Sequence, residues 1–173
     1  MISTLEQVSK KVRQQKKLGK KVGLITGCFD VLHFEHIRLF KFAKKHIDFL
    51  VIGLDNDKTI SLTKGKDRPI NKLQHRLEVI SELRCVDAVF AIEEVVDYRN
   101  PYDAELVYSK VAHDISPDYL ITHKKADSYW KIKKERAKHL QIKFLVGTGD
   151  KSISSTAIFD KQTKQKHFKE TKD

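Results

Sequence analysis

The sequence predicts an α/β protein built on a doubly wound, five-stranded parallel sheet of the Rossmann-like kind, with helices on both faces. Two observations support this fold class: short apolar runs recur along the 173 residues, and segments of helical periodicity separate them. Regular alternation of strand and helix favours a parallel sheet. Right-handed crossovers then place helices on both of its faces.

The apolar runs predict buried strands. They are rich in Val, Ile, Leu and Phe and show little alternation with polar residues, which is typical of strands covered on both faces. The predicted strands are 22–26, 49–54, 86–92, 119–122 and 142–146.

The segments between and after these runs predict amphipathic helices. In one of them Leu73, Leu77 and Ile80 form an apolar stripe at helical spacing. Since a doubly wound sheet binds its ligand beyond the carboxyl ends of its strands, the turns that enter these helices are the expected site. The predicted helices are 37–45, 72–84, 101–115, 128–139 and 154–164.

Charge divides the chain into three parts. The net charge is +11, but residues 1–21 hold seven Lys or Arg against one Glu, and residues 161–173 hold five Lys against two acids. We predict a basic lead-in helix within 1–20, a main domain at 21–160 and a basic tail at 161–173. Residues 1–21 have no aromatic residue, and Phe168 is the one aromatic residue among the lysines of 161–173. We therefore interpret the ends as solvated rather than as a nucleic-acid or membrane surface.

Composition favours a cytoplasmic protein with neither a nucleic-acid nor a membrane partner. The two cysteines, Cys28 and Cys85, are too few for a disulfide framework. No apolar run reaches the length of a membrane span, and the N-terminus lacks the order of a signal peptide.

The segment from Gly27 to His36 carries the clearest chemistry. It follows the first predicted strand and leads into a helix, so it is expected to be a tight turn and a helix N-terminus. His33 and His36 then share one face of the first helical turn. Free backbone N–H groups and two imidazoles at a helix N-terminus are suited to binding a phosphate.

This segment resembles the signature Gly-x-Phe-Asp-x-x-His-x-Gly-His of the HIGH-type nucleotidyltransferases, the cytidylyltransferase-like superfamily. The resemblance implies that a phosphate monoester attacks the α-phosphorus of a nucleoside triphosphate and that pyrophosphate leaves. It also implies that His33 and His36 are catalytic and donate to phosphoryl oxygens. The nucleotide-binding residues implied in this segment are Gly27, Cys28, Phe29 and Asp30.

A second element, residues 152–156, is similar to the superfamily's Ile-Ser-[Ser/Thr]-Thr sequence at the start of a late helix. Hydroxyl and N–H groups there would bind phosphate oxygens. The superfamily usually has an arginine just before this element, where this chain has Lys151. The implied nucleotide-binding residues are Lys151, Ser154, Ser155 and Thr156.

A third segment, residues 64–71, resembles the adenylyltransferase domain of bifunctional heptose-phosphate enzymes. The resemblance implies catalytic roles for Lys64 and for the helical Arg76, and acceptor binding by Lys66 and Arg68.

Two acidic residues follow strands at the same expected edge of the sheet. Asp57 comes after the second predicted strand and Asp127 after the fourth. By position, Asp57 is implied to bind the acceptor and Asp127 the nucleotide. Lys125 and Ala126 replace the glycines usual before Asp127.

The resemblance implies Mg²⁺ as a cofactor that enters with the triphosphate and is held mostly by phosphates and water. No protein metal site is expected, because the remaining histidines are scattered. A homodimer is also implied. The nucleotide stays open between CTP and ATP, and the small phosphorylated acceptor among a heptose phosphate, glycerol 3-phosphate and an amino-alcohol phosphate.

Glu35 motivates an alternative function. It stands where the superfamily has a glycine that lets the nucleotide approach the helix backbone. A carboxylate there would repel the triphosphate or block the base. The chain would then be a non-catalytic nucleotide-binding module.

Overall fold

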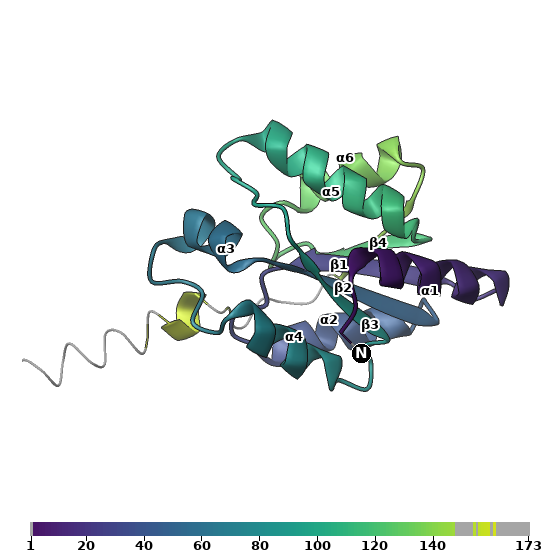
Figure 1. Cartoon of the computed structure of the whole chain (residues 1–173), viewed down its shortest axis with the longest axis horizontal. Helices are drawn as coiled ribbons and strands as arrows, with labels where there is room; N and C mark the ends of the chain where they lie inside the picture. The colour runs from purple at the N-terminus through teal and green to yellow at the C-terminus, as the bar shows by residue number, and fades with distance from the viewer. Residues whose placement is uncertain (1, 148–153, 155, 160, 162–173) are drawn as a thin grey trace, which may run out of the picture.

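A computed structural model of the chain describes residues 2–147, 154, 156–159 and 161. It contains one five-stranded sheet of order β3-β2-β1-β4-β5, in which every neighbouring pair is parallel (Figure 1). The predicted fold class is confirmed. The strands are β1 (Val22–Gly27), β2 (Phe49–Asp55), β3 (Ala88–Ile92), β4 (Tyr119–His123) and β5 (Lys143–Gly147).

The helices follow the predicted alternation, with one addition. The helix predicted at 101–115 has both of its expected ends, and the one predicted at 37–45 begins three residues earlier, at Phe34. Residues 156–159 are helical within the predicted segment 154–164. The named helices are α1 (Leu5–Lys17), α2 (Phe34–Lys44), α3 (Asp57–Lys64), α4 (Leu73–Ser81), α5 (Pro101–Ile115) and α6 (Trp130–His139).

The additional helix is α3, in a stretch for which no helix was predicted. It carries β-branched threonines and buries only Thr59 and Ile60, so its apolar periodicity is weak. The helix is stabilised by a cap instead: the Asn56 side chain accepts a hydrogen bond from the backbone N–H of Thr59.

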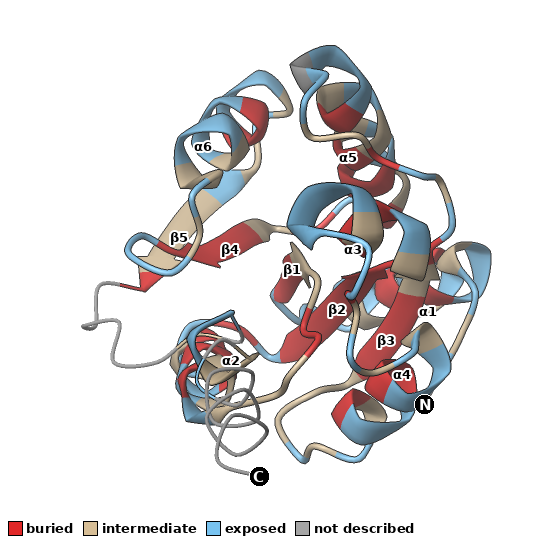
Figure 2. Ribbon diagram, turned by 90° about the vertical axis from the view of Figure 1, so that its left-hand side faces the viewer, coloured by how far each residue is buried: buried red, intermediate tan, exposed pale blue. Residues whose placement is uncertain are grey.

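Helices cover both faces of the sheet, and each face has its own hydrophobic cluster. Figure 1 shows α1, α5 and α6 on one side and α2 and α4 on the other. Successive residues of β2 point to opposite faces, so that Val51 joins the first cluster while Leu50 and Ile52 join the second. Figure 2 shows β2 buried along its length, as expected of a central strand.

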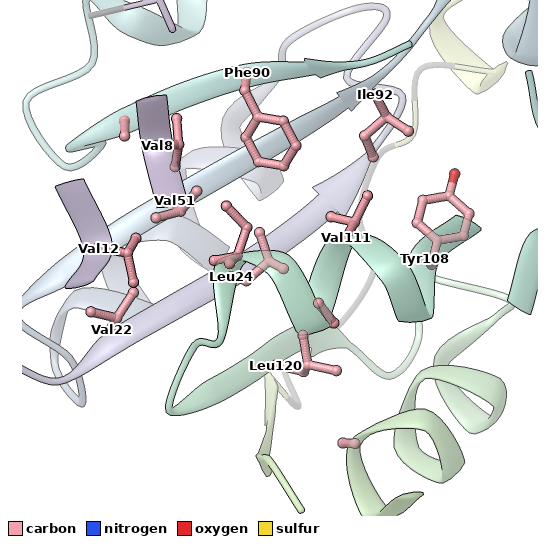
Figure 3. Close-up of a cluster of buried hydrophobic side chains, with 14 of the residues drawn as sticks. Val8, Val12, Val22, Leu24, Val51, Phe90, Ile92, Tyr108, Val111 and Leu120 are labelled. Atoms are coloured by element: carbon pink, nitrogen blue, oxygen red, sulfur yellow. The ribbon is translucent and has the colours of Figure 1, made fainter. Parts of the chain in front are cut away.

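Helix α1 is part of the first cluster. Val8 and Val12 have no exposed surface and pack with Leu24 and Phe90 of the sheet (Figure 3). A capping box between Thr4 and Gln7 begins the helix. The helix predicted at the basic N-terminus is therefore anchored by the core.

The order of the strands creates the crevice in which the site lies. The chain runs outward from β1 through β2 to β3, and then crosses back to place β4 and β5 on the other side of β1. The point between β1 and β4, where the direction of winding reverses, is where such sheets bind ligands. In the described part of the chain, no helix is long and apolar enough to cross a membrane.

Replacing Phe90 by alanine tests the packing of the first cluster. Phe90 is fully buried, and its loss leaves a cavity beneath α1 and α5. We expect the free energy of unfolding to fall by about 3–5 kcal/mol, measured by urea denaturation. The control is Val79→Ala, at a side chain that is 51% exposed, where a change within about 0.5 kcal/mol is expected. Equal effects of the two changes would contradict this packing.

Candidate functional site

A cavity of about 420 Å³ opens at the carboxyl ends of β1, β2 and β4. Six of the sequence-predicted site residues line it, from the turn after β1, the start of α2, the end of α3 and the loop after β4. These residues are Gly27, Cys28, Phe29, His36, Lys64 and Asp127.

The turn after β1 is held in a strained conformation that positions His36. Phe29 has a φ of 47°, in the left-handed region that costs energy for a residue with a Cβ. Its ring packs edge-on against His36, with centroids 5.0 Å apart, and lies 5.5 Å from the ring of Phe40. The strained turn thus fixes the imidazole against the core.

The two histidines have different positions. His33 is the N-cap residue of α2, and its backbone N–H donates to Nδ1 of His36 at 3.3 Å. The two rings stack with centroids 3.8 Å apart. Since Nδ1 of His36 accepts, its proton lies on Nε2. His36 lines the cavity, whereas His33 is not among the described residues that do.

His36 is a neutral hydrogen-bond donor. Burial, followed by the neighbouring His33 and Lys64, lowers the pKa of His36 from 6.5 to about 3. Near neutral pH its Nε2–H therefore offers a proton to an anion's oxygen without the cost of burying an imidazolium.

Glu35 lies beside this turn, in the first turn of α2. Its side chain is 5% exposed and pairs with Arg38 at 3.3 Å, three residues along α2. It is not one of the described residues that line the cavity. The obstruction considered from the sequence is therefore not seen among the described residues.

Asp30 and Arg68 form a buried ion pair. The Arg68 Nε–H donates to Oδ2 of Asp30 at 2.6 Å, and the backbone N–H of Asn71 donates to Oδ1 at 3.0 Å. Arg68 also lies over the ring of Phe159, 5.0 Å from its centroid. Asp30 thus ties the turn after β1 to the loop before α4. In this arrangement Arg68, predicted to bind the acceptor, is engaged by Asp30 and is not part of the described cavity wall.

Arg76 is buried as well, and its guanidinium binds the protein's own backbone. Nη1 donates to the carbonyl oxygens of Cys28 at 2.6 Å and Asp55 at 2.9 Å. Nη2 pairs with Asp57 at 2.8 Å, and Asp57 also accepts from the N–H of Leu73. The cavity walls, as far as the structure describes them, contain neither Arg76 nor Asp57. In the structure both side chains hold the loops around the cavity in place, and their contacts with substrate stay predictions.

The two lysines of the predicted basic loop differ. Lys64, the last residue of α3, lines the cavity. Lys66 lies beyond Gly65, whose φ of 103° turns the chain, and is exposed. Of these two lysines, Lys64 is the one that lines the cavity, where a ligand would contact it.

Asp127 is held by three donors. Thr122 donates to it at 2.5 Å and the N–H of Tyr129 at 2.9 Å, while Lys133 pairs with it at 2.7 Å. Burial raises the pKa of Asp127, but Lys133 and the two hydrogen bonds outweigh burial and lower it. Lys133 also donates to the carbonyl oxygen of Thr26 at 2.9 Å, which links the ends of β1 and β4.

The late serine-rich element is described only in part. Lys151 and Ser155 lie outside the described residues. Ser154 accepts a hydrogen bond from the N–H of Ala157 at 3.2 Å and so caps the helical turn that Thr156 begins.

A buried carboxylate and two tyrosines, for which no site role was predicted, form another wall. Tyr108 donates to Asp55 at 2.5 Å, and the Cys28 thiol donates to the same carboxylate at 3.3 Å. The rings of Tyr98 and Tyr129 lie 4.5 Å apart. Burial, with help from Asp55, raises the pKa of Cys28 to about 12, which agrees with a thiol that is not a nucleophile.

The magnesium ion expected to enter with the nucleotide stays a prediction, and the carboxylates at the cavity bear on how it would be held. Its two carboxylates, Asp55 and Asp127, are both engaged by protein donors. Within the described residues, no three His, Cys, Asp or Glu side chains are grouped so as to hold a metal ion.

Sequence comparison matches residues 24–161 to the family described as Cytidylyltransferase-like. "Bifunctional protein HldE" of Hyphomonas neptunium is 42% identical over 93 residues, covering 54% of this chain and 18% of that protein. "Bifunctional protein HldE" of Wolinella succinogenes is 33% identical over 120 residues, covering 69% of this chain and 23% of that protein. The matches span about a fifth of the length of these relatives.

Solved structures share the fold. The lipopolysaccharide core biosynthesis protein from Thermoplasma volcanium is 24% identical with a TM-score of 0.57, covering 77% of this chain and all of that one. A pantoate-beta-alanine ligase from Francisella tularensis is 19% identical with a TM-score of 0.66, covering 91% of this chain and 75% of that one. At these identities the likeness supports the fold alone.

The protonation of His36 can be tested by ¹H–¹⁵N NMR of its ring nitrogens between pH 8 and pH 4. We expect the neutral Nε2–H form throughout, because the pKa of about 3 lies below this range. The folded state then binds fewer protons than the unfolded chain between pH 6.5 and 3, so this group lowers stability as the pH falls through that window. Protonation of His36 near pH 6.5 in the folded protein would contradict the burial of its ring.

Proposed function

The chain belongs to the cytidylyltransferase-like family, and from this premise we propose that it is a nucleotidyltransferase that joins the nucleotidyl group of CTP or ATP to a small phosphorylated acceptor with release of pyrophosphate. The observation that carries the proposal is the neutral Nε2–H of His36, which lines a cavity at the switch point between β1 and β4. A hydrogen-bond donor beside the free N–H groups of a helix N-terminus is a favourable binding site for a phosphoryl group.

In the proposed reaction, a phosphate oxygen of the acceptor forms a bond to the α-phosphorus, and the bond from that phosphorus to the bridging oxygen of pyrophosphate breaks. The attacking monoester is already ionised, since its second pKa is about 6. The protein therefore needs to align the anions and to stabilise charge on the phosphorus. His36 would donate to an equatorial oxygen, and the Lys64 ammonium would offset negative charge. Mg²⁺ bound to the triphosphate would neutralise part of its charge.

The lining residues suggest where each substrate lies. Asp127 and Ser128, beyond β4, would face the nucleoside, whereas Lys64, at the end of α3, would face the phosphates. The resemblance of residues 64–71 to heptose-phosphate enzymes favours a sugar phosphate as acceptor. A cytoplasmic homodimer remains part of the proposal and rests on composition and resemblance.

The alternative, a binding module blocked by Glu35, has less support. Glu35 is paired with Arg38, and the described cavity walls do not contain it. His36 and Lys64, which a blocked site would not need, both line the cavity.

Pyrophosphate release measures the proposed activity. The protein is mixed with Mg²⁺ and either ATP or CTP across a panel of sugar, glycerol and amino-alcohol phosphates. We expect release with at least one pair, and a roughly 10²–10³-fold lower kcat for His36→Ala because one transition-state donor is lost. His113→Ala, at a side chain that is 79% exposed, is the matched control and should keep the normal rate. Nucleotide binding without release by any pair would instead favour the binding module.

Glu35→Gly separates the two functions further. Because Glu35 pairs with Arg38 and is not among the described residues that line the cavity, we expect the nucleotide dissociation constant to change less than about threefold. Isothermal titration calorimetry measures it, with Arg38→Ala as the control for loss of the ion pair. A tenfold or greater gain in affinity would show that the carboxylate obstructs the nucleotide.

A further inference from the structure

A second imidazole lines the same cavity. His123 is the last residue of β4, at the carboxyl edge of the sheet, and it lines the cavity together with His36. Its sequence context marks it only as one of several scattered histidines. The residue as a whole is 8% exposed.

Hydrogen bonding defines which ring nitrogen carries the proton. The backbone N–H of Ala126 donates to Nδ1 of His123 at 3.1 Å. Nδ1 therefore has no proton, and Nε2 is the N–H donor. In the part of the chain that the structure describes, no group accepts a hydrogen bond from this Nε2. Because His123 lines the cavity, this N–H is available to a ligand oxygen.

The His123 ring lies beside the end of β5 and near α2. A Cβ placed on Gly147 at the end of β5 would lie 3.3 Å from Cδ2 of His123 and 3.5 Å from Cδ1 of Leu39. The glycine leaves room for the imidazole at this point. Leu39 also lines the cavity, and it lies three residues after His36 on the same face of α2. Cδ2 is bonded to Nε2, and His123, Leu39 and His36 line the same cavity.

We propose that His123 is a further phosphate-binding residue, which donates from Nε2 to a phosphoryl oxygen of the triphosphate that His36 contacts. This inference rests on the proposed nucleotidyltransferase function. Two imidazole N–H donors, one of them in the first turn of α2, then line the cavity. The carboxylates of Asp55 and Asp127 on its other walls are already engaged by protein donors, which leaves the imidazole side to receive the anion.

Two substitutions separate phosphate binding from support of the loop. In His123→Asn, the amide oxygen can still accept from the N–H of Ala126, but the donor at the Nε2 position is lost. In His123→Gln, an amide N–H is restored near the Nε2 position, while the contact with Ala126 is given up. We expect inorganic triphosphate with Mg²⁺ to bind roughly 10- to 100-fold more weakly to the Asn variant. The Gln variant should stay within about threefold of the unmodified protein.

Isothermal titration calorimetry measures both affinities, and thermal unfolding checks that each variant is folded. A larger loss of affinity in the Gln variant than in the Asn variant would overturn the proposal, because that order indicates a loop-supporting role. Normal affinity in both would overturn it as well. The unmodified protein provides a second measurement: adding triphosphate should shift the His123 Nε2–H resonance, and an unmoved resonance at saturation would contradict the proposed contact.

The failure of this inference is distinguishable from that of the proposed function. If the protein releases pyrophosphate while the Asn variant binds triphosphate normally, the inference fails and the activity stands. If no substrate pair releases pyrophosphate but triphosphate binds and the Asn variant loses that binding, the activity fails and the phosphate site stands.

Discussion

The buried guanidinium of Arg76 is the contact on which the arrangement of the site depends. It joins the carbonyl oxygens of Cys28 and Asp55, which follow or end neighbouring strands, to the side chain of Asp57 at the start of α3. An arginine suits this task because its planar group donates in several directions at once. Removing one partner would leave a buried charge uncompensated, which typically costs several kcal/mol. The geometry of the catalytic edge is thus secured by a residue that does not itself line the described cavity.

The carboxylates at and around the cavity are also paired, because a buried charge without a partner is costly. Asp30 is paired with Arg68, Asp127 with Lys133, and the Asp55 carboxylate accepts hydrogen bonds from Tyr108 and Cys28. With the carboxylates occupied, the groups that can receive an anion include the imidazole N–H groups and the Lys64 ammonium. A neutral imidazole suits such a place, since a buried imidazolium would be costly and the low pKa of His36 reflects that cost.

Local signals explain which parts were predictable. The segment from Gly27 to His36 is a strand, a turn and a helix start in direct succession, so its geometry follows from neighbours in sequence. The strands and α5 were predicted for the same reason, because their periodicity lies within the element. Helix α3 was missed because its stability comes from the Asn56 cap and from tertiary contacts more than from an apolar stripe. His123, Lys133 and Tyr98 carry no motif, and only folding brings them to the cavity.

The sequence by itself determined the fold class, the family resemblance and the place of the phosphate-binding turn, since each depends on short-range pattern. The tertiary structure decided which charged side chains face the cavity. Arg68 and Arg76 belong to a motif-like segment, yet they bind Asp30 and Cys28, which precede them by 38 and 48 residues. A buried charge must be paired, and its partner is found only when remote segments pack together. For that reason a basic residue in a motif indicates only that it lies near the site. Its burial and its pairing in the folded protein determine whether it contacts the ligand.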